Sequence, residues 1–113
     1  MNDMTIAIPI TTEGAVFERL AKAPLVATCV LRDGEIADWT EHAVGWDQTY
    51  GVDVMGNHHA RVMRFMQDNE VTDVVAADVC DNMRRSLAAK GVTLHADQTG
   101  DARTAVRSAL QPA

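Results

Sequence analysis

At 113 residues, of which 47% are hydrophobic, the chain has the size and composition of one globular domain, so we expect a single domain over residues 1–113. The net charge of −6, without a run of basic residues, argues against nucleic-acid binding, because phosphate contacts require a basic surface. No apolar run approaches the roughly 20 residues that span a bilayer, and no secretory signal is evident. With two cysteines there is no disulfide framework, so we expect a cytoplasmic protein without a membrane partner.

The first half of the chain is predicted to form mostly strands. In chain order, we expect a strand over 5–10, a short helix over 15–22, a strand over 25–31 and a return strand over 35–43. Pro24 ends the short helix. The strand after it is almost continuously apolar, which predicts that both of its faces are covered. Asp33-Gly34 is a strong hairpin-turn signal, and Ile36 and Trp39 are predicted to pack on the return strand.

The second half is predicted to alternate helices and strands. After a loop over 44–57 we expect a helix over 58–69, a strand over 73–77, a helix from 81 or 82, a strand over 92–95 and a C-terminal helix. Asn57 is predicted to cap the first of these helices. Val62, Met63 and Met66 should face inward there, as should Met83 in the next helix. The last helix carries an apolar stripe of Ala102, Ala105, Val106, Ala109 and Leu110.

This order predicts an α/β fold with a mixed five-stranded sheet and helices on both faces. The βαβ unit in the second half requires parallel pairing, and the hairpin contributes an antiparallel strand. The topology brings all four histidines and one cysteine to the carboxyl edge of the sheet, where open α/β sheets usually bind ligands. These residues are His42, His58, His59, Cys80 and His95.

Imidazole and thiolate are ligands for thiophilic metals rather than for Mg²⁺ or Ca²⁺. Cys80 is the best candidate ligand, because it precedes a predicted helix whose N-terminus favours thiolates and anions; the alternative is a small buried hydrophobe. The adjacent His58 and His59 cannot both point at one ion, so at most one is a ligand. His95, at the end of a strand, is better interpreted as a solvated side chain, His42 is a still weaker candidate ligand, and Cys29, in mid-strand, is interpreted as core.

Other chemistry is poorly supported by the sequence. Met55, Met63, Met66 and Met83 could suggest thioether copper ligands, but the last three have helical spacing and are predicted to fill the core. No carboxylate pair forms a recognisable acid and base, and no nucleophile elbow or phosphate-binding glycine loop is present. We therefore expect a non-enzymatic protein, with a metal-dependent hydrolase as a less favoured alternative.

Two segments, MTIAIPI at 4–10 and APLVATCVLRDGEI at 23–36, resemble the KIAIPV-type opening strand and the hairpin of the dinitrogenase iron–molybdenum cofactor biosynthesis family (NifX-like domains). The resemblance extends over residues 4–110. It implies a three-layer α/β/α, ribonuclease H-like fold with sheet order 3-2-1-4-5 and an antiparallel second strand. It also implies a role related to nitrogen fixation: carriage of an iron–sulfur or molybdenum-containing cluster, together with cofactor-assembly proteins.

The signature loops of the family locate the expected site. The family's HFGRAP aligns with RLAKAP at 19–24, which puts Arg19 where the family has a histidine implicated in cofactor contact. Gly56 fits the character of the family's loop before the main helix, and AADVCD at 76–81 replaces the GG-x-G-P turn. The expected site comprises Cys80, His59 and His58 as candidate metal ligands, with Arg19 and Lys22 as contacts of an anionic cluster.

Two functions remain open at this point. The leading hypothesis is a small carrier of a metal cluster whose site has moved to Cys80. The alternative is a metal-free protein-interaction or regulatory domain that keeps the fold, which the changed loops at 19–24 and 76–81 favour. The identity of the metal is open in either case. An exposed third strand at the sheet edge could also pair with a copy of itself, so a homodimer is a further expectation.

Overall fold

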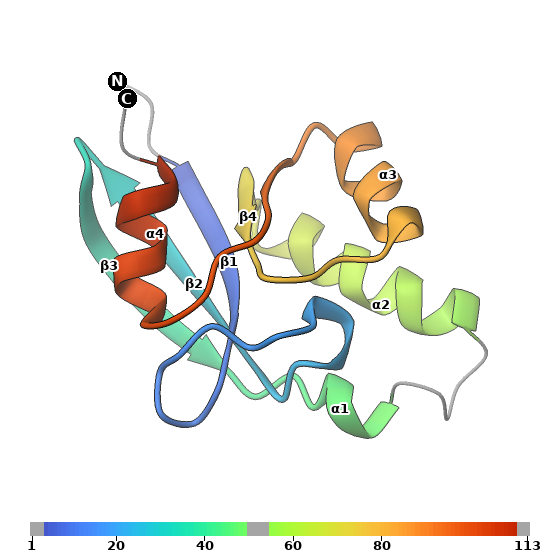
Figure 1. The fold of residues 1–113 in the computed structure, drawn as a ribbon. Helices are drawn as coiled ribbons and strands as arrows, with labels where there is room; N and C mark the ends of the chain where they lie inside the picture. Colours follow the sequence, from blue (N-terminus) through green and yellow to red (C-terminus); the bar gives the residue numbers. More distant parts are fainter. Residues whose placement is uncertain (1–3, 50–54, 111–113) are drawn as a thin grey trace.

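The computed structural model describes residues 4–49 and 55–110. Its strands are β1 (Met4–Ile10), β2 (Leu25–Arg32), β3 (Glu35–His42), β4 (Asp73–Val75) and β5 (Thr93–His95). Its helices are the 3₁₀ turn η1 (Leu20–Lys22), α1 (Trp46–Thr49), α2 (Met55–Asp68), α3 (Asp81–Ala89) and α4 (Ala102–Leu110) (Figure 1). Among the described residues, no helix combines the length and apolarity needed to cross a membrane.

The five strands form one mixed sheet in the order β3-β2-β1-β4-β5, which confirms the predicted order. β2 is antiparallel to both β1 and β3, whereas β1–β4 and β4–β5 are parallel pairs. The hairpin turn has positive φ angles at Asp33 (55°) and Gly34 (80°), as the two central residues of a type I′ turn require. Asp and Gly are among the residues that adopt this left-handed backbone most readily, which is why this dipeptide predicts the hairpin.

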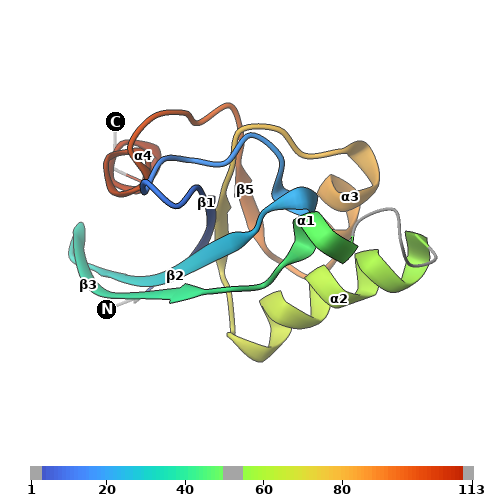
Figure 2. The same ribbon diagram turned by 90° about the horizontal axis from the view of Figure 1, so that it is seen from below.

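Helices cover both faces of the sheet, with α2 and α3 on one face and α4 on the other (Figure 2). Side chains alternate along β1, so Ile6 and Ile8 pack towards α4 while Ala7 packs towards α2. The C-terminal stripe is confirmed: Ala102, Ala105 and Val106 are buried, and Ala109 and Leu110 pack against them.

Two predictions in the first half are wrong. Residues 15–22 do not form a helix; only their last turn is helical, because Val16 forms a β-bridge with Ile10 and donates its N–H to the Gly100 carbonyl at 2.8 Å. Residues 44–57 are not a continuous loop, since Trp46 is buried and begins α1. Of the same stretch, residues 50–54 lie outside the described residues, and α2 begins at Met55, so Asn57 is inside the helix and does not cap it.

Helix starts in the second half also differ from prediction. Cys80 is the N-cap of α3, in place of Asp81 or Asn82, and its side chain makes no capping hydrogen bond. At α4, Asp101 caps the helix by accepting the N–H of Thr104 at 3.0 Å. That backbone hydrogen bond, followed by a second from the Thr104 hydroxyl, lowers the pKa of Asp101 below its usual value.

β4 ends at Val75, two residues earlier than predicted, because the chain diverges from the sheet over the next residues. The Ala76 N–H still donates to the His95 carbonyl of β5 at 3.0 Å, but the Asp78 N–H donates to the Glu18 carbonyl at 3.1 Å. The second of these hydrogen bonds attaches the segment after β4 to the segment before η1. This attachment forms one wall of the candidate site.

Candidate functional site

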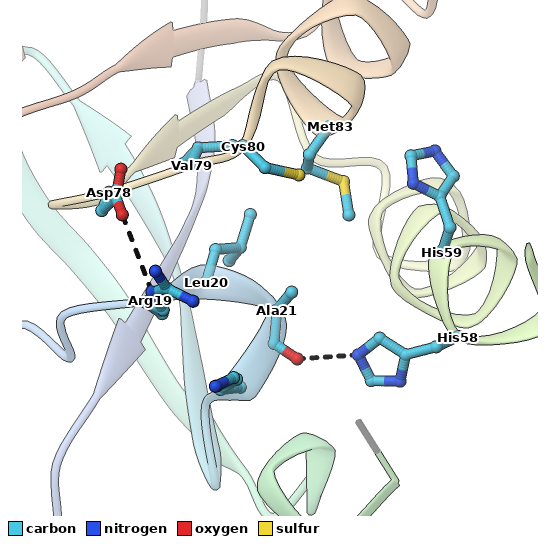
Figure 3. A pocket seen from close by; sticks show the side chains of 10 residues that line it. Arg19, Leu20, Ala21, His58, His59, Asp78, Val79, Cys80 and Met83 are labelled. Atoms are coloured by element: carbon cyan, nitrogen blue, oxygen red, sulfur yellow. Dashed lines mark hydrogen bonds and ion pairs between the residues drawn. The ribbon is translucent and has the colours of Figure 1, made fainter. Parts of the chain in front are cut away.

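A cavity of about 130 Å³ opens at the carboxyl edge of the sheet, between η1, the N-terminal part of α2 and the start of α3 (Figure 3). All five residues of the predicted site line it: Arg19, Lys22, His58, His59 and Cys80. The remaining lining residues, which sequence reasoning did not assign to the site, are Leu20, Ala21, Asp78, Val79 and Met83. We call this cavity the edge pocket.

The two loops that differ most from the family motifs form adjoining walls of the edge pocket. Arg19 and Asp78 are parallel bridge partners, and the Leu20 N–H donates to the Asp78 carbonyl at 3.4 Å. The Arg19 Nε atom also lies 3.7 Å from Asp78 Oδ2, with the two side chains 54% and 66% exposed. An exposed pair of this kind contributes about 0–1 kcal/mol, so the backbone hydrogen bonds, rather than the ion pair, position the wall.

His58 is a structural residue in this conformation. The residue is 2% exposed; its Nε2 lies 2.7 Å from the Ala21 carbonyl oxygen and its Nδ1 lies 3.3 Å from Thr49 Oγ1. A carbonyl oxygen can only accept, so Nε2 carries the proton and Nδ1 accepts from the threonine hydroxyl. Both ring nitrogens are therefore engaged, and His58 joins α2 to η1 and α1 instead of presenting a lone pair to the pocket.

His59 has a different environment. Its Nε2 lies 2.7 Å from Ser86 Oγ on α3, and the half-buried ring lines the edge pocket. Within the described part of the chain, its other ring nitrogen has no hydrogen-bond partner. Of the adjacent histidine pair, His59 is thus the one that can bind a metal.

The two cysteines are sharply different. Cys80 is an exposed free thiol at the pocket wall. Cys29 is 1% exposed in β2, which confirms that it belongs to the core. Burial raises the pKa of Cys29 to about 11, an effect that Arg103 partly opposes.

The other two histidines reach the carboxyl edge but do not line the edge pocket. His42 Nε2 lies 2.9 Å from Thr28 Oγ1, and its ring contacts Phe65 edge-on. His95 Nε2 lies 2.9 Å from Asp73 Oδ2. Both residues are half-buried, each with a partner on the neighbouring strand, so His95 is not the solvated side chain that the sequence suggested.

A second, more open hollow of about 520 Å³ adjoins the edge pocket. The two share Arg19, Lys22 and Asp78, and Phe17 and Glu18 complete the outer hollow. Two cationic side chains therefore stand where the hollows meet, with the carboxylates of Glu18 and Asp78 close by. An anion that enters here encounters both signs of charge.

The donor set does not match a preformed site for a hard or borderline metal. In the ranges 4–49 and 55–110, no three His, Cys, Asp or Glu side chains are grouped so that they could hold a metal ion. The edge pocket instead offers one exposed thiol and one imidazole with a free nitrogen. Any metal held by these two needs a further ligand, either from its own cluster or from another residue type.

No known protein-family model matches the sequence, and no curated protein matches it either. Solved structures do match. A proposed dinitrogenase from Methanocaldococcus jannaschii superposes with a TM-score of 0.68 and 9% identity, covering 95% of this chain and 88% of that one. A proposed NifB protein from Thermotoga superposes with a TM-score of 0.65 and 20% identity, covering 93% of this chain and 85% of that one.

The apo form of the orange protein from Desulfovibrio gigas superposes with a TM-score of 0.71 and 18% identity, covering 92% of this chain and 84% of that one. At such low identity these matches establish the fold alone. The chain thus has the α/β fold of these small proteins over almost its whole length.

Proposed function

We propose that this protein is a small, non-enzymatic carrier that binds a metal–sulfur cluster as cargo at the edge pocket. The observation that carries the proposal is the convergence of Arg19, Lys22, His59 and Cys80 on one cavity at the carboxyl edge. The structural neighbours described as dinitrogenase-like, NifB-like and an apo protein agree with a role around a bound group.

The size of the edge pocket limits how the cargo can sit. Its volume of about 130 Å³ is below the roughly 300–1,000 Å³ typical of pockets that enclose a drug-sized ligand. A cluster therefore enters the edge pocket with one side only, and the rest of it occupies the adjoining hollow of about 520 Å³. Shallow seating of this kind suits cargo that must be passed on to a cofactor-assembly protein.

The positive charge of Arg19 supports cluster binding when its guanidinium exchanges the Asp78 carboxylate for the anionic cluster. Arg19 and Lys22 attract an anionic cluster, while Glu18 and Asp78 oppose it. Because the exposed Arg19–Asp78 pair contributes about 1 kcal/mol at most, an anion with several charges can replace the carboxylate as the partner of Arg19. We therefore assign Arg19 the role of an anion contact that exchanges partners.

Carriage is favoured over catalysis by the lack of an activated nucleophile. A cysteine nucleophile requires a base within hydrogen-bond reach. Among the described contacts, Cys80 makes no hydrogen bond with His59, and the nitrogens of the neighbouring His58 are occupied by Ala21 and Thr49. The thiol is better suited to ligation than to acyl or phosphoryl transfer.

The test is anaerobic reconstitution. The protein is purified without oxygen, offered iron, sulfide and molybdate, and assayed for metal per chain by elemental analysis. We expect near-stoichiometric metal in the wild-type protein, loss in Cys80→Ala and His59→Ala, and weaker retention in Arg19→Gln. His42→Gln, at the same sheet edge but outside the pocket, is the matched control and should retain metal. Equal metal in Cys80→Ala and the wild-type protein would exclude this site.

A second function, a metal-free interaction domain, is favoured by two observations. The donor set described above lacks a third classical ligand, and residues 76–81 contain no glycine that would let backbone approach a bulky cluster closely. If no metal is retained above background under any loading condition, this function replaces the first. Partner binding should then survive Cys80→Ala and His59→Ala.

A further inference from the structure

Three side chains follow one another at successive turns of α3 and its cap. Cys80 is the N-cap, Met83 lies three residues later and Ser86 three residues after that, so each neighbours the next along the helix surface. An N-cap side chain extends over the first turn, where it normally bonds a backbone N–H. Cys80 makes no such bond, so its sulfur lies beside the turn that holds Met83 without being committed to the helix.

Met83 has a position that the sequence could not distinguish from ordinary core filling. It is 2% exposed and packs in the core on the α2 side, as its helical spacing predicts, yet it also lines the edge pocket. Figure 3 shows the sulfur atoms of Cys80 and Met83 turned towards the same space, with the ring of His59 facing them. A thioether and a thiol from the first turn of α3 and its cap thus line the same cavity as an imidazole from α2.

Ser86 holds that imidazole in place. The 2.7 Å hydrogen bond between Ser86 Oγ and His59 Nε2 joins α2 to α3, one turn after Met83. When Nε2–H donates to the serine oxygen, the lone pair of the imidazole is on Nδ1, the nitrogen that has no partner among the described residues. Histidines that bind metals commonly donate their second nitrogen in this way, which fixes both tautomer and ring orientation.

We propose that the edge pocket binds a soft monovalent metal ion, copper(I), through the Cys80 thiolate, the Met83 thioether and His59 Nδ1. Thiolate and thioether ligands select Cu(I), whereas Zn²⁺ is usually held by four ligands drawn from thiolate, imidazole and carboxylate. Of the pocket's other donors, His58 is engaged with Ala21 and Thr49, and Asp78 offers a carboxylate, a donor that suits harder ions than Cu(I). Binding replaces the thiol proton, which passes to solvent.

This inference rests on the proposed function in one respect, that the edge pocket is the binding site. It deepens that function by naming the class of metal ion that the side chains of the edge pocket coordinate. It also supplies the third ligand that thiol and imidazole alone lack, since a thioether completes the set without a third His, Cys, Asp or Glu. The cluster and the bare ion are separable experimentally, because only the cluster needs Arg19 and Lys22.

The experiment uses the full chain, reduced and kept anaerobic. Cu(I) is titrated in competition with a chromophoric Cu(I) chelator, and Ag(I), a redox-inert soft ion, is used for NMR of methyl-labelled methionines. We expect one ion per chain, a shift of the Met83 methyl signal, and affinity reduced on the order of 10- to 100-fold or more in Met83→Leu, Cys80→Ser or His59→Gln. Zn²⁺ should bind more weakly than Cu(I).

Met66→Leu is the matched control, because Met66 is also 2% exposed but lies on α2 away from the edge pocket. Leucine is close in volume to methionine, so both variants should stay folded. Unchanged Cu(I) affinity in Met83→Leu, or an Ag(I) shift equal at both methyl groups, overturns the inference. The probe of the cluster proposal is thiomolybdate, an anionic molybdenum–sulfur species. Thiomolybdate binding without Cu(I) binding overturns the Cu(I) inference and leaves the cluster proposal standing. Cu(I) binding without cluster retention supports the inference and overturns the cluster proposal.

Discussion

The two sides of the molecule treat similar residue types in opposite ways. On the α4 side of the sheet, Arg103 stacks 4.2 Å over the Trp39 ring, and Trp39 Nε1 donates to Glu41 at 3.1 Å. The one thiol there, Cys29, is buried. At the edge pocket the thiol is exposed, and a ring nitrogen of His59 has no partner among the residues described.

The difference shows where this fold keeps reactive groups available. Polar and soft side chains on the α4 side are satisfied by their neighbours, so they stabilise the sheet and have little capacity left for a ligand. At the edge pocket His58 is likewise engaged through both ring nitrogens, but the Cys80 thiol makes no capping hydrogen bond and His59 makes one, to Ser86. The thiol and one ring nitrogen of His59 therefore have no partner among the described residues. Local packing, and not residue type, therefore separates the committed cysteine and histidines of this chain from those with an atom available to a ligand.

The largest expected contrast is in thiol reactivity. With its pKa at about 11, Cys29 is ionised in only about one molecule in a thousand at pH 8, and burial also blocks reagents. A thiol-specific reagent should modify Cys80 at least ~100-fold faster than Cys29 in the folded protein. Mass spectrometry of the modified peptides identifies the site, and denaturant should release the slow thiol. A fast phase that survives in Cys80→Ala would show that Cys29 is accessible and reverse the contrast.

The next contrast is between two histidines of the carboxyl edge. His58→Ala removes hydrogen bonds to Ala21 and Thr49 and leaves a buried carbonyl without its donor, so we expect a loss of roughly 2–3 kcal/mol in the free energy of unfolding. His42→Ala removes one hydrogen bond and a ring contact at a less buried place and should cost about 1 kcal/mol. Urea denaturation measures both. Similar losses for the two variants would mean that His58 does not join α2 to η1.

Much of this architecture could be predicted from the sequence because it depends on local patterns. Asp33-Gly34 required a left-handed turn, and the stripe from Ala102 to Leu110 had a clear helical period. The placement of His58, His59 and Cys80 at one edge followed from strand order, whereas Arg19 and Lys22 came from the resemblance of residues 19–24 to the family motif. The direction of the side chains did not follow, since backbone topology places His42 and His95 at the edge without showing that Thr28 and Asp73 turn them away.

The missed features depend on contacts between residues far apart in the sequence. Val16 is strand-like because it meets Ile10 and Gly100, and no local signal predicts that pairing. Likewise, helical spacing predicts that Met83 faces inward. Only the three-dimensional arrangement shows that the inward face of α3 also borders a cavity.

A smaller effect is expected from the charge at the meeting point of the two hollows. Asp78→Asn removes a carboxylate that competes for Arg19, so binding of thiomolybdate should strengthen on the order of two- to fivefold, since exposed charges interact by about 1 kcal/mol or less. Raising the salt concentration should reduce the gain. Asp68→Asn, with the same change in net charge at the far end of α2, is the control. Weaker binding in Asp78→Asn would show that Asp78 positions Arg19 rather than competing for it.

The smallest expected effect concerns the α4 side and tests whether its polar groups act only in stability. The pKa of Asp101 is lowered by the N–H and hydroxyl of Thr104, so its charged form stabilises the folded state. For a lowered carboxyl pKa, this stabilisation is complete above the unfolded value of 3.8 and is lost as pH falls through the folded value. Asp101→Ala should therefore lower Tm at neutral pH, and this decrease should shrink towards pH 2. In Asp101→Asn the decrease in Tm should be smaller, because asparagine can still cap the helix. Metal retention should be unchanged in both variants; any loss would mean that α4 and the edge pocket are coupled through the sheet, and that the two sides are not independent.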